Sequence, residues 1–398
     1  MRKILTYVAA ALCAASCIYP YTPDIEEAPE GIMAVDGDIC IGDISWVRLG
    51  PLYSMWPSAG QPVDWWGTNF YDAVVWVEDD AGQQYIGTPY TQPGGSTIDY
   101  ASYYNGAQFT IDTSDAPMDR SYRLCIKALG EKYVSDWSEP LEAPRIGDIG
   151  FTADDENVTV LVSVDAGEHA TGYLLLSYDE TWEFHADYFP NNTFIPPMTV
   201  QEGMTPEGYN EYWCFKYSND GRSQPVDYTG MTEAGVKDFP LLKFLRTNPR
   251  NHKRYCVNVK AKTISAASYR FLKTLEENTD GGDNLFTPNP GEIAGNLRCE
   301  TDPERTVLGY VIVSRATTKR AFLDARYLKH QKPSTASIIY LPTDKWNDYY
   351  NYGYLPLIPN PTPEYDPTIE GPYGWGPKYC YDCIAAGGTK TRPDFWDE

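Results

Sequence analysis

Basic residues are scarce in this sequence, and that scarcity argues against two classes of function. The 398 residues include 32 Lys and Arg against 55 Asp and Glu, so the formal net charge is −23 at pH 7. Nucleic acids and anionic membrane surfaces both bind proteins through clustered cations. We therefore expect no nucleic-acid partner and no membrane binding through basic residues.

Catalytic signatures and metal-ligand clusters are missing as well. The sequence has no H-E-x-x-H, G-x-S-x-G, P-loop or dinucleotide-binding motif. A closed zinc site needs four N or S ligands, but the four histidines are scattered and the C-x-x-C of Cys380 and Cys383 supplies only half a site. We expect no metal and no cofactor. A hydrolase whose carboxylates come from distant strands would leave no local motif.

No apolar run is long enough to cross a bilayer as a helix, which takes about 20 residues. A shorter run, Ile4 to Ser16, follows two basic residues and is typical of a secretory signal peptide. Small residues directly before Cys17 resemble the lipobox of bacterial lipoproteins. We predict a signal peptide over residues 1–16, lipidation of Cys17 and an acidic, proline-containing tether over 17–30. The alternative is ordinary cleavage, with Cys17 as one more disulfide cysteine.

Helical periodicity is absent from residues 31–145, where short alternating apolar runs lie between Gly, Pro and Asp clusters. The run MAVDGDICI, which begins at Met33, alternates in this way. Several such strands predict an immunoglobulin-like or transthyretin-like β-sandwich domain. The turn from Asp80 to Gly82 predicts a hairpin within it.

Residues 146–398 predict a larger β-rich domain with one or two short helices. Alternating valines between residues 158 and 164 indicate a half-buried strand. A helix is predicted over 265–279, where Ser265 can cap the helix and apolar residues recur at helical spacing. A second, shorter helix is predicted near residues 236–245.

Disulfide bonding is the default for cysteines of an exported protein. Of nine cysteines, seven remain after removal of Cys13 with the signal peptide and acylation of Cys17, so one has no partner within the chain. The phases of the first-domain strands favour a Cys40–Cys125 bridge. Cys214 pairs either with Cys256 or with one of the C-terminal pair, and the remaining connectivity is open. The disulfide candidates are Cys40, Cys125, Cys214, Cys256, Cys299, Cys380 and Cys383.

Aromatic residues are concentrated near the C-terminus. Residues 344–379 hold many rings among prolines and glycines and predict a long loop, which in a compact domain is functional or disordered. Either its rings contact a partner or ligand, or they cap the second domain. Phe395 and Trp396 at the C-terminus either contact a partner or pack back on their own domain. We predict that Trp346, Tyr350, Tyr352 and Trp375 are exposed to solvent and contact the partner or ligand. Phe395 and Trp396 are further binding candidates.

Three segments carry a family resemblance: an LF-x-P-x-P-x-x-I-x-GN run, an LGY strand and a C-x-D-C…GGT…P-x-FW tail. With the lipobox, they resemble the Bacteroidota outer-membrane lipoprotein family called domain of unknown function 4249. The resemblance implies a lipoprotein that is usually encoded beside a TonB-dependent receptor and has no established activity. The matching positions are Leu285, Phe286, Pro288, Pro290, Ile293, Gly295, Asn296, Leu308, Gly309, Tyr310, Cys380, Asp382, Cys383, Gly387, Gly388, Thr389, Pro393, Phe395 and Trp396.

Three functions are compatible with these observations. The first is an accessory subunit of a TonB-dependent transporter in ligand capture or uptake, lipid-anchored in the outer membrane and facing the cell exterior. Its partner would be the β-barrel receptor. The second is a structural or assembly component of an outer-membrane complex that binds no small ligand. The third is a carbohydrate- or peptide-acting hydrolase. The sequence does not name the ligand.

Overall fold

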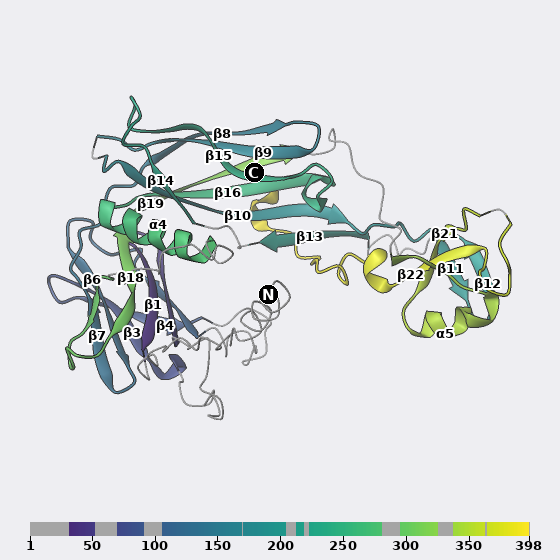
Figure 1. Ribbon diagram of the computed structural model, residues 1–398, viewed down its shortest axis with the longest axis horizontal. Helices are drawn as coiled ribbons and strands as arrows, with labels where there is room; N and C mark the ends of the chain where they lie inside the picture. The colour runs from purple at the N-terminus through teal and green to yellow at the C-terminus, as the bar shows by residue number, and fades with distance from the viewer. Residues whose placement is uncertain are drawn as a thin grey trace, which may run out of the picture.

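The computed structural model has a mainly β fold, which confirms the predicted fold class, and Figure 1 shows it as two sandwich-like bodies and a smaller lobe. The predicted signal peptide, Cys17 and the tether lie outside the described residues, as does most of the LF-x-P-x-P run. The described residues are 32–51, 70–90, 106–168, 170–203, 212–218, 223–280, 295–324, 337–362 and 364–397.

The first body is a nine-stranded sheet with strand order β17-β7-β6-β3-β4-β5-β2-β1-β18. β3 and β4 form the predicted hairpin, and Gly82 in its turn has a φ of 84°. The apolar side chains of alternate positions meet in one core. The elements are β1 (Met33–Cys40), β2 (Ile44–Pro51), η1 (Phe70–Asp72), β3 (Val74–Asp79), β4 (Gln84–Pro89), β5 (Ala107–Asp112), β6 (Tyr122–Ala128), β7 (Glu131–Ser135), β17 (Leu297–Cys299) and β18 (Val307–Ser314).

Two strands from much later in the chain complete this first body. β18 pairs with β1 in parallel, with Met33 opposite Val307, and β17 pairs with β7. The side chain of Asn296 accepts a hydrogen bond from the N–H of Val311 and donates one to its carbonyl oxygen, each at 2.8 Å. The Gly-Asn pair of the family motif therefore holds β18 in place, which is a structural role.

The second body packs a five-stranded sheet, β13-β10-β16-β19 with β14 on β10, against a three-stranded sheet, β15-β9-β8. The alternating valines of β9 lie in the core between the two sheets, as predicted. The strands are β8 (Arg145–Ala153), β9 (Asn157–Asp165), β10 (Tyr173–His185), β13 (Trp213–Ser218), β14 (Gln224–Asp227), β15 (Gly235–Leu245), β16 (Arg254–Thr263) and β19 (Ala316–Asp324).

The short helix predicted near residues 236–245 is wrong, because this segment is the edge strand β15. It pairs with β9 from Gly235 opposite Asp165 to Leu245 opposite Asn157, with two register shifts. Proline destabilises a helix interior but is tolerated in an edge strand, so Pro240 fits the observed strand better than the predicted helix. Pairing with the apolar strand β9 outweighs the local helical spacing.

The predicted longer helix is confirmed as α4 (Ala266–Asp280), and it lies against both bodies. Ser265 Oγ accepts a hydrogen bond from the N–H of Ser268 at 3.0 Å, as an N-cap does. Tyr269 stacks on Tyr173 of β10 at 4.6 Å between ring centroids. Phe271 packs on Tyr310 of β18 at 5.0 Å. The helix therefore ties the second body to the strand that completes the first.

The small lobe at the right of Figure 1 is built from two distant stretches of chain. Phe194 from the first stretch packs against Trp346 and Trp375 from the second, at 6.3 and 5.2 Å between ring centroids. Its elements are β11 (Asn192–Ile195), β12 (Thr199–Glu202), β20 (Ile339–Tyr340), η5 (Thr343–Lys345), α5 (Trp346–Asn351), β21 (Leu355–Pro359) and β22 (Tyr373–Gly376).

The prediction of a long loop over residues 344–379 is therefore wrong for most of that range. Trp346 and Trp375 are buried in the lobe core, contrary to the prediction that they are exposed. Tyr350 and Tyr352 are 37% and 79% exposed, as predicted. The short strands and the six-residue helix α5 have no clear local pattern, because the lobe core depends on pairing between segments far apart in sequence. No helix among the described residues is long and apolar enough to cross a membrane.

Candidate functional site

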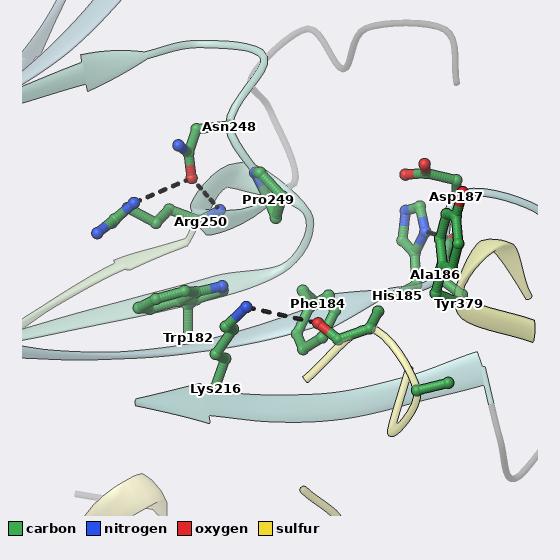
Figure 2. A pocket seen from close by; sticks show the side chains of 12 residues that line it. Trp182, Phe184, His185, Ala186, Asp187, Lys216, Asn248, Pro249, Arg250 and Tyr379 are labelled. Atoms are coloured by element: carbon green, nitrogen blue, oxygen red, sulfur yellow. Dashed lines mark hydrogen bonds between the residues drawn. The ribbon is translucent and has the colours of Figure 1, made fainter. Parts of the chain in front are cut away.

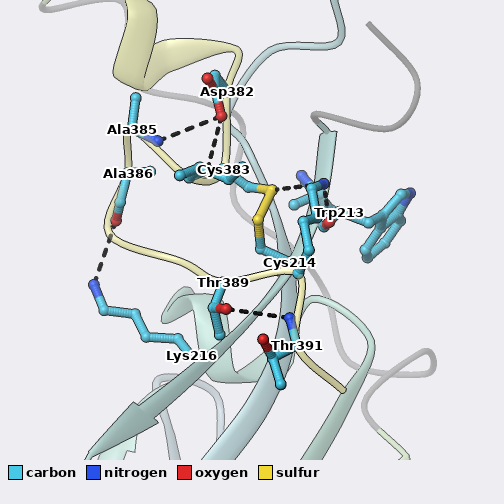
Figure 3. The surroundings of a disulfide bond; sticks show 12 residues. Trp213, Cys214, Lys216, Asp382, Cys383, Ala385, Ala386, Thr389 and Thr391 are labelled. Atoms are coloured by element: carbon cyan, nitrogen blue, oxygen red, sulfur yellow. Dashed lines mark hydrogen bonds between the residues drawn. A yellow bond between two sulfur atoms is a disulfide. The ribbon is translucent and has the colours of Figure 1, made fainter. Parts of the chain in front are cut away.

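A disulfide between Cys214 of β13 and Cys383 holds the C-terminal segment against the second body (Figure 3). The predicted Cys40–Cys125 bridge is wrong. These two cysteines lie on β1 and β6, which are separated by four strands in the sheet, and both are buried thiols. Burial raises the pKa of Cys40, and it raises that of Cys125 to about 12. Strand phase gives the face of a cysteine but not its neighbour across the sheet.

The C-x-D-C…GGT motif builds the turn that carries Cys383. Asp382 is buried, and its carboxylate accepts hydrogen bonds from the N–H groups of Ile384 at 2.8 Å and Ala385 at 3.3 Å. A Cβ on Gly388 would lie 2.6 Å from the Cβ of Cys214, so only glycine lets the turn approach β13 this closely. Thr389 then pairs with Phe215 on β13.

Phe395 and Trp396, in η7 (Asp394–Asp397), pack on their own domain, which is the second of the two predicted alternatives. Burial removes Trp396 from the binding candidates. The Trp396 ring is buried and lies 5.2 Å from that of Phe215. Phe395 is half-buried, with the Arg320 guanidinium 3.9 Å from its ring centroid. Large apolar rings at a chain end need burial, and the second body provides it.

A pocket of about 550 Å³ lies where this C-terminal turn meets the second body (Figure 2). Trp182 and Phe184 of β10 line it and also belong to the core. Further walls come from β13, from η2 (Pro249–Asn251) and from η6 (Lys378–Cys380). The lining residues are Trp182, Phe184, His185, Ala186, Asp187, Lys216, Asn248, Pro249, Arg250, Tyr379, Ala385 and Ala386.

One wall of the pocket is a largely buried ion pair between Arg250 and Glu180. The Arg250 guanidinium donates to both carboxylate oxygens of Glu180, at 2.7 and 2.6 Å, and also to Asn248. Tyr255 donates to the same carboxylate at 2.7 Å. Burial opposes the charge on Arg250, but these bonds raise its pKa. Arg250 also lies 4.5 Å from the Trp182 ring centroid, so the pair fixes the aromatic floor rather than offering a free charge.

Two hydrogen-bond donors on the floor of the pocket, Trp182 and Lys216, have few or no acceptors among the described residues. The indole N–H of Trp182 is buried, the side chain being only 6% exposed, and it has no hydrogen-bond partner among the described residues. Figure 2 shows the nitrogen end of this ring turned toward Lys216. Within the described part of the chain, Lys216 forms no ion pair and donates only to the Ala386 carbonyl, at 3.4 Å.

The opposite side of the pocket carries aromatic rings and one carboxylate. The His185 ring stacks between His252 at 4.0 Å and Tyr212 at 4.8 Å. Asp187 lies beside it, and burial raises the pKa of this carboxyl group while His185 lowers it. Among the described residues no group of three or more His, Cys, Asp or Glu side chains is arranged to hold a metal ion.

None of the predicted binding residues lines this pocket, although Tyr379 from the predicted aromatic segment does. The sequence holds one pattern that points to the pocket: Trp182, Phe184 and Ala186 alternate at the end of β10 and just after it, next to His185 and Asp187. The rest of the site could not be found by pattern, since its walls come from segments as far apart as residues 182 and 386.

A family model described as a domain of unknown function, DUF4249, matches residues 18–320, which is more than half of the chain. No curated protein matches the chain. The match covers both sandwich-like bodies, while the C-terminal turn with Cys383 and most of the small lobe follow it. By the extent of this match, the chain belongs to the DUF4249 family, a domain of unknown function.

Proposed function

We propose that this protein is a lipoprotein of the outer membrane that captures a small ligand for a TonB-dependent receptor at the cell surface. The pocket beside Trp182 and Lys216 is the observation that carries the ligand-capture part of the proposal. Binding sites for small molecules are concave and mostly apolar, with a few well-placed polar groups. This pocket has an aromatic floor, an indole donor without a partner and a lysine without a carboxylate partner among the described residues, which an assembly component would not need.

The anchor follows from the sequence around Cys17. A lipidated cysteine there, carrying several acyl chains, would attach the protein stably to a membrane. The tether from Cys17 to Ile32 could reach at most about 50 Å when fully extended. The protein would therefore hold its pocket within reach of a barrel in the same membrane.

The receptor partner rests on the family resemblance, which implies a Bacteroidota origin and a TonB-dependent receptor as genetic neighbour. The small lobe supports the view that a protein surface is contacted. Tyr352 is 79% exposed, and Met198 and Ile369 of the same region are also exposed. These residues equally favour the second candidate function, an assembly component of an outer-membrane complex.

A hydrolase is not proposed. Glycoside hydrolysis uses two carboxyl groups that flank the scissile bond. Asp187 is the only carboxylate among the described residues that line the pocket, and it lies beside a histidine that is stacked between two rings.

The test is affinity purification of the tagged lipoprotein, expressed at its native level and extracted with mild detergent. We expect a TonB-dependent β-barrel to co-purify in stoichiometric amount, and an untagged strain serves as the control. Recovery of the lipoprotein alone would refute the receptor partnership. Co-purification of a complex with no transporter in it would support the assembly role instead.

A further inference from the structure

We propose that the pocket binds the carboxylate of a small organic acid that carries one negative charge and an apolar body. This inference deepens the proposed function, on which it rests for its biological purpose, by naming the class of ligand. It is argued from the donors, the charges and the shape of the pocket.

The two donors in the pocket indicate that the ligand carries a hydrogen-bond acceptor. The indole N–H of Trp182 and the ammonium group of Lys216 can only donate hydrogen bonds. A buried donor without a partner is costly, and nearly all buried polar groups in folded proteins are paired. The Trp182 N–H has no partner among the described residues, and its nitrogen is turned toward Lys216. An acceptor group placed between the two side chains would satisfy both of them.

The positive charge of Lys216 indicates that the ligand is an anion. The described lysines Lys253, Lys260 and Lys262 pair with carboxylates, as expected in a chain with a net charge of −23. Lys216 instead has one hydrogen bond of 3.4 Å to a carbonyl oxygen. Arg250 does not compete for the ligand because Glu180 already neutralises it. The positive charge available inside the pocket is therefore that of Lys216.

The remaining walls of the pocket indicate the size and polarity of the rest of the ligand. Phe184, Ala385 and Ala386 present apolar surface, and a volume of about 550 Å³ suits a small molecule. Asp187 lies on the opposite side of the pocket, as Figure 2 shows, and would repel a second carboxylate. A monocarboxylate with an aromatic or aliphatic body fits both ends of the site.

The experiment is calorimetric titration of the full-length chain in detergent with N-acetylphenylalanine. The neutral amide of the same molecule and inorganic phosphate are the comparison probes. We expect the acid to bind and the amide not to bind, because only the acid carries the charge that Lys216 recognises. Stronger binding of phosphate than of the acid would overturn the carboxylate assignment, and so would equal binding of acid and amide or failure of the acid to bind.

Two variants locate the site. Lys216→Met should weaken binding of the acid by about ten- to a hundredfold, the usual effect of losing a charge-assisted hydrogen bond. The control Lys243→Met removes the same charge from β15, outside the pocket, and should leave binding unchanged. Equal effects of the two variants would overturn the proposal, since they would reflect net charge alone.

Trp182→Phe tests the indole donor while keeping an aromatic floor. It should weaken binding of the acid. The smaller ring also removes buried apolar volume from the core, so the melting temperature is measured to confirm that the variant is folded during the titration. In the wild type, the indole N–H resonance that this variant lacks should shift on addition of the acid. An unshifted resonance would overturn the role of Trp182. If the acid fails to bind while the receptor still co-purifies, the ligand class is wrong and the receptor partnership stands.

Discussion

Gly309 of the family's LGY strand shows how one residue can set the shape of a sheet. Its φ is +128°, a region that side chains disfavour, and a Cβ there would clash with the carbonyl oxygen of Val35 on β1. Gly309→Ala should lower the free energy of unfolding by about 3 kcal/mol or more, as measured by urea denaturation. The control is Gly82→Ala, where φ is +84° but nothing lies near the added Cβ, so a loss of about 1–2 kcal/mol is expected. Equal losses would contradict the clash.

The buried thiol of Cys125 should make the free energy of unfolding fall as the pH rises above 9. Burial raises the pKa of its thiol from 9.0 to about 12, so the folded state keeps a proton that the unfolded chain releases. Stability from this group is therefore complete below pH 9 and is lost as the pH rises toward 12. The difference in unfolding free energy between wild type and Cys125→Ala should fall by about 1.4 kcal/mol per pH unit in this window.

Denaturation at a series of pH values measures this difference. An alkylation experiment gives an independent check, because Cys125 should resist iodoacetamide in the folded protein at pH 8 and react after unfolding. A constant difference between the two proteins, or rapid alkylation of the folded one, would show that the thiol is not held in its neutral form.

The position of the C-terminal tail depends on its disulfide bond to β13. The Cys214–Cys383 bond closes a loop of 169 residues, and removal of a native disulfide costs about 2–5 kcal/mol. The double variant Cys214→Ala with Cys383→Ala should lose stability in this range. It should also weaken ligand binding, since Ala385 and Ala386 of the pocket belong to the linked turn.

Peptide mapping without reduction should find the Cys214–Cys383 linkage and should find Cys40 and Cys125 as thiols. The control Cys299→Ala changes a buried thiol in the first body and should leave binding unaffected. A mapped Cys40–Cys125 bridge would contradict the observed sheet order.

The small lobe separates rings that stabilise from rings that are available for contact. Trp375 is fully buried in the lobe core, so Trp375→Ala should destabilise the lobe by about 3–5 kcal/mol. Tyr352 is 79% exposed, and Tyr352→Ala should change stability by no more than about 0.5 kcal/mol. Hydrogen exchange of the lobe strands would distinguish the two. Similar exchange rates in both variants would mean that the lobe core is placed wrongly.

The whole molecule is expected to depend on Cys17 for its location but not for its fold. The first described strand, β1, begins at Met33, sixteen residues after Cys17 in the chain. Cys17→Ser should therefore shift the protein from the membrane to the soluble fraction and abolish labelling with palmitate, with an unchanged melting temperature. Continued palmitate labelling of the variant would show that a residue other than Cys17 carries the lipid.

The sequence determined the features that depend on neighbouring residues. The β fold class followed from alternating runs, the hairpin from Asp80 to Gly82, and α4 from helical spacing with Ser265 as its cap. Local backbone preference and side-chain periodicity fix such elements wherever the rest of the chain lies. The resemblance to the DUF4249 family was also visible in short runs of residues, and the match over residues 18–320 confirms it.

Only the tertiary structure decided the features that depend on distant residues. Pairing with β9 made residues 236–245 a strand, and the fold placed Cys383, rather than Cys256, beside Cys214. Trp346 and Trp375 are buried against Phe194, which lies 152 and 181 residues earlier in the chain. The pocket required β10, β13, η2 and the C-terminal turn together. Contacts of this kind are set by packing across the whole chain, and no local pattern of residues encodes them.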